Sequence, residues 1–440
     1  MAKDKTLALT IKIAGKMDKS LLSALNSSQR QISSFSRGLS KIGTAGLAAM
    51  GAMTTATIAG LKSCANEAVK YQNELGDVIK YVDGLADASG KITNELAKNA
   101  RGEVLNGKTY AENYDLVYDS IQRIATQVPL TREYLTEMTA AIGQSGKTIE
   151  QMFTFNSDGT IGGLVKDAAI MAAAWDIEAK ETANYAAKWE NSFNMSHEQV
   201  VELANQINYL GANSATTAAE IANAVNQAVS LGQLAGIDPS TTVALADAML
   251  ATGVASDRVG TSIKRMALNL SKGADMTKKQ KGVLDEMGLS AEWVSKAMTE
   301  DSVGTLKTLF EGISNLPKER QLNAVGQLFG IWAAEGGAKI VNNLDVYRSA
   351  LEMVADQEAY ANSMQREFNV KSATPEAVRQ MRDSAISMFK VNIGKSFVPL
   401  QTQWDDSIRN LMLRLNDNMP QFEQLSGTLA DLASKGIAKI

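Results

Sequence analysis

The stretch NMSHEQVVELANQINYLGANSATTAAEIANAV, residues 194–225, contains two complete helix starts. Ser196 is followed three residues later by Gln199, and Thr217 is followed at the same distance by Glu220. In such a capping box the two side chains bind backbone N–H groups of the first turn, so a helix begins there. We expect Gly211 to end the first of these helices. Helices that start and stop so close together are typical of a globular, mainly α-helical region.

Similar signals extend on both sides, and residues 120–273 are predicted to form a series of short helices. Thr131 opens one of them, and Asp238 followed by Pro239 is a cap followed by a proline in the first turn. Three more glycines are expected at helix ends, namely Gly146, Gly236 and Gly253.

Helices are also predicted after this region. They continue from Lys278 to Leu316, break at Pro317, and resume up to a last long helix that starts at Thr374-Pro375. The glycine-rich stretch FNSDGTIGGL, which begins at Phe155, has neither the acidic spacing of a calcium loop nor the lysine of a phosphate-binding loop. We interpret it as a turn.

The composition limits the chemistry that the chain can perform. It has one cysteine, Cys64, and one histidine, His197, in 440 residues. An internal disulfide is therefore excluded, and a zinc site would consist almost wholly of carboxylates. His197 directly follows a capping serine, so we expect a solvated side chain rather than a catalytic base. We predict no cofactor, no metal site and no catalytic residues.

The net charge of −4 is spread over interspersed acidic and basic residues. Because there is no basic stripe, sequence-specific binding of nucleic acid is not expected.

The N-terminal residues contain the clearest strand pattern. Leu7, Leu9, Ile11 and Ile13 alternate with smaller or polar residues up to Gly15. A lone strand has unpaired backbone groups, so it either adds to an edge in another copy or another protein, or is a short extension without order of its own.

A heptad pattern follows. Its apolar positions are spaced alternately four and three residues apart, with Ser28 as a polar member; they are Leu21, Leu25, Ile32, Phe35, Leu39 and Ile42. This stripe predicts a seam between copies in a coiled coil, and a helical hairpin within one chain would use the same stripe.

Residues 42–61 carry no charge and are mostly Gly, Ala and Thr. One face of the predicted helix is small throughout, at Ala48, Ala52, Ala56 and Gly60, and such a face lets helices approach closely in water or in lipid. Because Gly, Ala and Thr contribute little to membrane insertion, we favour a close-packing helix over an obligate membrane span.

We therefore predict a mainly α chain in four parts. Residues 1–15 hold the strand, and residues 16–110 form a long helical or coiled-coil segment. Residues 111–350 form a compact all-α core, and residues 351–440 form C-terminal helices that may be continued in a longer chain.

Several motifs resemble, in order, the core region of phage tail tape measure proteins. They are IGTAGLAAMGAM from Ile42, AVKYQNELGDV from Ala68, VPLTREYLTEMTAAIGQSG from Val128, LANQINYLGANSATTAAEIANAV from Leu203, LAGIDPSTTVALADAMLATGVASDRVGTSIKRMALNL from Leu234, RQLNAVGQLFG from Arg320 and NIGKSFVPL from Asn392. GTSIKRM after ATGVASDRV is the most specific piece, and the resemblance covers residues 7–420. Members of the family are often much longer than this chain.

The resemblance implies a non-enzymatic scaffold. Tape measure proteins run along the lumen of the growing tail tube, set its length and leave through it at infection, often with membrane activity. Implied partners are further copies of the chain in a parallel trimer, the tail tube protein, assembly chaperones, the baseplate hub and the tail terminator. The implied location is the virion tail, after assembly in the bacterial host cytoplasm.

Two other function classes were weighed. The alternative is a helical membrane-perturbing protein that uses residues 42–61 as a pore or anchor. An enzyme such as a cell-wall hydrolase is disfavoured, because the residues for acid–base chemistry are missing.

Overall fold

The computed structural model describes residues 55–395, except residue 100, residues 157–159 and residues 230–235. The described residues divide into two units. The first unit comprises residues 75–385, and the second contains residues 55–74 and 386–395.

Most of the described residues are helical, which confirms the mainly α fold. Strands in the described residues are confined to two short antiparallel pairs. The pairs are β1 (Leu96–Lys98) with β2 (Val104–Thr109), and β3 (Thr154–Phe155) with β4 (Ile161–Gly162). Neither pair can be predicted from the sequence, because these strands are too short or too exposed to show an alternating apolar pattern.

The first helices of the first unit pack around α6. This part contains α4 (Gly76–Tyr81), α5 (Tyr110–Ala125), α6 (Arg132–Gln144) and α7 (Ile149–Met152). Helix α6 packs against both α4 and α5. A Cβ atom at Gly143 of α6 would lie 2.5 Å from Val82 Cγ2 and 3.0 Å from the carbonyl oxygen of Tyr81. Glycine at this position therefore lets α6 approach the end of α4.

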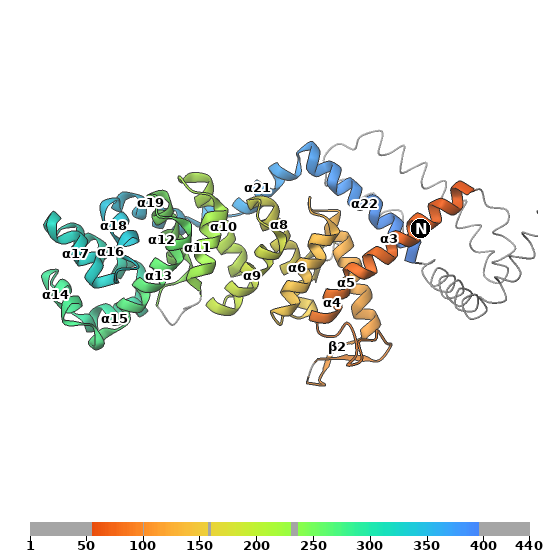
Figure 1. Cartoon of the computed structure of the whole chain (residues 1–440), viewed down its shortest axis with the longest axis horizontal. Coiled ribbons are helices and arrows are strands. Elements are labelled where there is room, and N and C mark those ends of the chain that lie inside the picture. The colour runs from red at the N-terminus through yellow and green to blue at the C-terminus, as the bar shows by residue number, and fades with distance from the viewer. Residues whose placement is uncertain (1–54, 100, 157–159, 230–235, 396–440) are drawn as a thin grey trace, which may run out of the picture. The chain divides into compact units, whose positions relative to one another are not determined.

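The middle of the first unit is a succession of helices in which neighbours in the chain pack together (Figure 1). They are α8 (Leu164–Trp175), α9 (Ala179–Phe193), α10 (His197–Asn213), α11 (Ala218–Ala228), α12 (Pro239–Ala251) and α13 (Ser256–Leu270). Trp189 is fully buried, with Tyr185 stacked on it at 5.9 Å between ring centroids and Trp175 at 6.5 Å. The Trp175 indole N–H donates to Asn208 Oδ1 at 3.0 Å, which joins α8 to α10.

The remaining helices of the first unit have an aromatic core of their own. They are the 3₁₀ helix η3 (Gly273–Asp275), α14 (Lys278–Glu286), α15 (Ala291–Glu300), α16 (Ser302–Ser314), α17 (Lys318–Phe329), α18 (Ala334–Asn342), α19 (Leu344–Ala355), α20 (Gln357–Tyr360) and α21 (Ser363–Ser372). The Phe310 ring contacts Phe329 and Tyr347, with centroids 5.5 and 5.4 Å away. Helix α19 packs on α12, and α21 returns to α8 and α10.

The second unit contains α3 (Thr55–Glu74) and the end of α22 (Pro375–Lys395), a helix that begins in the first unit. The Ser387 hydroxyl donates to Glu67 Oε1 at 2.6 Å. Gly394 lies so close to α3 that a Cβ atom there would overlap the carbonyl oxygen of Cys64 and lie 2.9 Å from Ala68 Cβ.

The helix starts confirm the capping signals of the sequence. Both bonds of the capping box are present at Ser196 and at Thr217. Asp238 accepts a bond from the backbone N–H of Thr241, with Pro239 in the first turn of α12. Thr131 and Thr374 likewise accept bonds from the first turns of α6 and α22.

The predicted helix ends are confirmed at two glycines and wrong at a third. Gly146 and Gly253 directly follow the C-caps of α6 and α12, with φ of +84° and +87°. Gly211 instead lies inside α10, where a Cβ atom would overlap the backbone nitrogen of Ala218. This glycine permits the close approach of the start of α11, and it does not end the helix.

Candidate functional site

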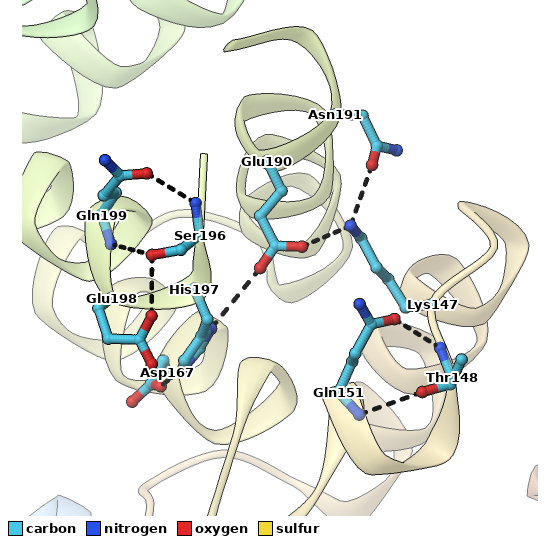
Figure 2. A network of polar contacts seen from close by, with 10 residues as sticks. All are labelled: Lys147, Thr148, Gln151, Asp167, Glu190, Asn191, Ser196, His197, Glu198 and Gln199. Atoms are coloured by element: carbon cyan, nitrogen blue, oxygen red, sulfur yellow. Dashed lines mark hydrogen bonds and ion pairs between the residues drawn. The ribbon is translucent and has the colours of Figure 1, made fainter. Parts of the chain in front are cut away.

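A group of charged side chains in the first unit joins segments that are distant in sequence, and we call it the His197 cluster (Figure 2). It consists of Lys147, Asp167, Glu190 and His197. Lys147 lies between α6 and α7, Asp167 is on α8, Glu190 is on α9, and His197 is the first residue of α10.

Local sequence signals position the members of this cluster. The capping box of Ser196 and Gln199 fixes His197 in the first turn of α10. A second capping box, formed by Thr148 and Gln151, fixes the start of α7 directly after Lys147. The chain turns from α9 into α10 at Asn194, which has a left-handed conformation with φ of 52°.

The contacts form a chain of alternating charges. His197 Nε2 lies 2.7 Å from Asp167 Oδ2, and His197 Nδ1 lies 3.7 Å from Glu190 Oε1, which is an ion pair but too long for a hydrogen bond. The other oxygen of Glu190 lies 2.5 Å from Lys147 Nζ. Lys147 Nζ also donates to Asn191 Oδ1 at 3.0 Å.

Burial makes this pairing necessary. The side chains of Glu190 and Lys147 are only 9% and 10% exposed, and charges so far from water need partners. The hydrogen bond to Asp167 and the interaction with Glu190 raise the pKa of His197 to about 10, although burial opposes the shift. Burial alone would raise the pKa of Glu190, but its interactions with His197 and Lys147 lower it overall.

The cluster is suited to holding helices together rather than to acid–base catalysis. A histidine with a pKa of about 10 carries a proton at neutral pH and cannot accept another, so it is no general base. The neighbouring Ser196 hydroxyl is engaged with Glu198 Oε2 at 2.8 Å and with the backbone N–H of Gln199. Among the described residues, no group of His, Cys, Asp and Glu side chains has the arrangement of a metal site.

The expectation of a solvated His197 is therefore wrong. Its side chain is 33% exposed and is bound by carboxylates from two other helices. These partners are hidden in the sequence because Asp167 lies 30 residues from His197 and meets it only through the packing of α8 against α10. The available signal was a lone histidine in a first turn together with Asp167 in the mostly apolar helix α8.

A second polar site holds a buried carboxylate. Asp247 on α12 is 1% exposed, and its Oδ1 accepts hydrogen bonds from Ser214 at 2.5 Å and Thr216 at 2.7 Å. Its Oδ2 has no hydrogen-bond partner. Burial raises the pKa of Asp247, although the two hydroxyl donors partly oppose the shift.

Most of the binding residues predicted from sequence lie outside the described residues. These are the strand residues Leu7, Leu9, Ile11 and Ile13, the seam residues Leu21, Leu25, Ile32, Phe35, Leu39 and Ile42, and the small residues Ala48 and Ala52.

Ala56 and Gly60 lie on α3. The same four-residue spacing continues to Cys64 and Ala68, which face Gly394 of α22. None of the helices within the described part of the chain combines the length and the apolar character needed to cross a membrane.

Comparisons with known proteins agree with the resemblance seen in the motifs. Residues 118–330 match the family described as phage-related minor tail protein. This range includes the whole His197 cluster. The chain is also 26% identical, over 266 residues, to a probable tape measure protein of Halomonas phage phiHAP-1. The alignment covers 60% of this chain and 31% of that relative. No solved structure matches the chain.

Proposed function

We propose that this chain is a phage tail protein related to tape measure proteins and that it sets the length of the tail tube during assembly. The observation that carries the proposal is the match to a probable tape measure protein over 60% of the chain. The chain spans about a third of that relative, so the proposal concerns the part that the two proteins share.

The helical structure supports a role in determining tail length. An α-helix advances ~1.5 Å per residue, so a chain of helices that runs along a tube converts residue number into length. Helix α22, with 21 residues, is the longest described helix and would span about 32 Å.

The proposal includes a location and partners. The protein lies in the lumen of the tail tube after assembly in the host cytoplasm, and it leaves through the tube at infection. It forms a parallel trimer through the seam of residues 21–42 and contacts the tube protein, assembly chaperones, the baseplate hub and the tail terminator. The uncharged residues 42–61 contact the host membrane during ejection.

We assign a structural rather than a catalytic role to the described region. Tail proteins of this kind are in general structural, and the His197 cluster supports this role because its histidine is held protonated between two carboxylates.

The test is tail length after duplication of a helix. Tandem copies of residues 375–393 that add ~60 residues should lengthen the tail by up to ~90 Å in electron micrographs, if the segment is helical along the tube. If particles still form and their tails have unchanged length, this segment does not contribute to tail length.

A matched control inserts the same number of residues in the turn between β1 and β2. The ends of this turn are held together, because the Asn99 backbone N–H donates to the Glu103 carbonyl oxygen at 3.0 Å. If the first unit stays folded in the tube, this insertion leaves the tail length unchanged. If both insertions lengthen the tail equally, the first unit is unfolded and extended along the tube.

A further inference from the structure

Three strongly exposed apolar side chains of the first unit lie on α17 and directly after it. Ile331 is 80% exposed, Trp332 is 68% exposed and Leu322 is 67% exposed. Together with Leu268 of α13 we call these residues the Trp332 surface. Large apolar side chains grouped on a surface mark interaction sites, and tryptophan is the residue most enriched among binding hot spots.

The backbone that presents Ile331 and Trp332 is fixed. Their neighbours Phe329 and Ala333 are fully buried. Asn269 Nδ2 of α13 donates to the carbonyl oxygen of Phe329 at 2.7 Å, and Ser262 Oγ of the same helix donates to that of Trp332 at 3.3 Å. The segment thus runs along α13, and the backbone that carries the two exposed side chains is held in place before any partner arrives.

The surface continues along α17. Leu322 and Gly326 are spaced four residues apart and share one face of this helix, and Gly330 directly follows its end; we call this line of residues the track. Within the described part of the chain, a Cβ atom at Gly326 would meet no atom within 4 Å, so this position is open, whereas a Cβ atom at Gly330 would lie 3.2 Å from Asn269 Nδ2. The track from Leu322 to Gly330 is ~12 Å long, which corresponds to about two turns of a partner helix.

The charges beside the track are mainly positive. Helix α13 contains Arg258, Lys264 and Arg265 against a single acidic residue, Asp257. Arg258 is paired with Glu335 of α18 at 2.9 Å, whereas Lys264 and Arg265 form no ion pair with another described residue. Arg265 is exposed one turn before Leu268.

We propose that the Trp332 surface binds an acidic amphipathic helix of another protein. Its apolar face would cover Trp332, Ile331 and Leu322, and its acidic residues would meet Lys264 and Arg265. A helix fits because the line from Leu322 to Gly330 corresponds to about two helical turns, so the apolar face of one partner helix can cover it. This inference does not depend on the proposed role in tail length.

The test uses a designed helical peptide of about 18 residues, long enough to be helical, with Leu and Trp on one face and Glu on the other. A twin peptide has Lys in place of every Glu. Binding of each labelled peptide to the full chain is followed by fluorescence anisotropy. We expect the acidic peptide to bind at least ~10-fold more tightly than its twin.

Variants then locate the site. Trp332→Ala should weaken binding of the acidic peptide by ~30-fold, and Arg265→Glu should remove the preference for the acidic peptide. Both residues are exposed, so the fold should be retained, which circular dichroism checks. Tyr134→Ala changes an aromatic residue on α6 that is 51% exposed and should have no effect.

Three results would overturn the proposal. The first is equal binding of both peptides, or of neither. The second is an affinity for the acidic peptide that Trp332→Ala leaves unchanged. The third is binding of anionic phospholipid vesicles, or self-association in sedimentation, that depends on Trp332 while peptide binding does not, because the surface would then belong to a membrane or to a second copy.

Discussion

Replacing His197 with glutamine should destabilise the first unit in a pH-dependent way. Glutamine removes the positive charge between Asp167 and Glu190 but can still form a hydrogen bond. The wild-type pKa is raised from 6.5 to about 10. A shift of this size corresponds to an upper limit of about 5 kcal/mol in the free energy of unfolding. Because the side chain is 33% exposed, solvent screening reduces our expectation to ~1–2 kcal/mol.

The direction of the pH dependence follows from the raised pKa. Below the ordinary pKa of 6.5 the histidine is protonated in both folded and unfolded chains, so the stabilisation is complete. It declines as the pH rises from there and is lost above about pH 10, where the folded chain releases the proton. The difference in unfolding free energy between wild type and His197→Gln should therefore be largest at about pH 6 and close to zero at about pH 10.5.

Urea unfolding followed by tryptophan fluorescence measures this difference, since Trp175 and Trp189 lie on α8 and α9 beside the cluster. Adding Asp167→Asn completes a double-mutant cycle, which isolates the coupling between the two side chains. Arg379→Gln breaks an exposed pair with Glu376 and serves as the control, for which we expect no measurable change. A coupling of the same size at both pH values would refute a protonated His197 that bridges the helices.

Two further predictions concern packing and burial. Gly394→Ala should lower the stability of the α3–α22 contact by ~1–3 kcal/mol, because the added Cβ has no room beside α3. Gly326→Ala, at an open position of α17, should instead raise stability by up to ~1 kcal/mol. Equal changes in melting temperature for the two variants would contradict the close approach of Gly394 to α3. Asp247→Asn removes a buried acid whose pKa is raised, so wild type should lose stability relative to the variant as the pH rises above ~4. Parallel stability curves from urea unfolding would show that the Asp247 charge is not penalised by burial.

The sequence could predict the helices because their signals are local. The capping box of Ser196 and Gln199 lies within four residues, and Pro239 directly follows the cap Asp238 in the first turn, a helix position that favours proline. Such features do not depend on the rest of the fold, so the mainly α architecture and many helix starts could be predicted.

What the sequence could not show depends on contacts between distant elements. Gly211 looks like a helix end, but its role is set by the backbone of Ala218, which is brought close by the turn between α10 and α11. His197 looks solvated until α8 and α9 bring Asp167 and Glu190 to it. The exposure of Trp332 was equally hidden, because a tryptophan in a helical region is usually part of a core.

If the chain passes through the tail tube as we propose, the capping boxes have a consequence for its refolding. Both bonds of the box are present at Thr109, Thr148, Ser196, Thr217 and Thr277, and each joins residues three apart. Stretching the chain separates α8 from α9 and disperses the aromatic cores, but it leaves each box encoded in its own four residues. When such a chain leaves the tube and folds again, its helices begin at the same residues, because each start is specified by four neighbouring residues.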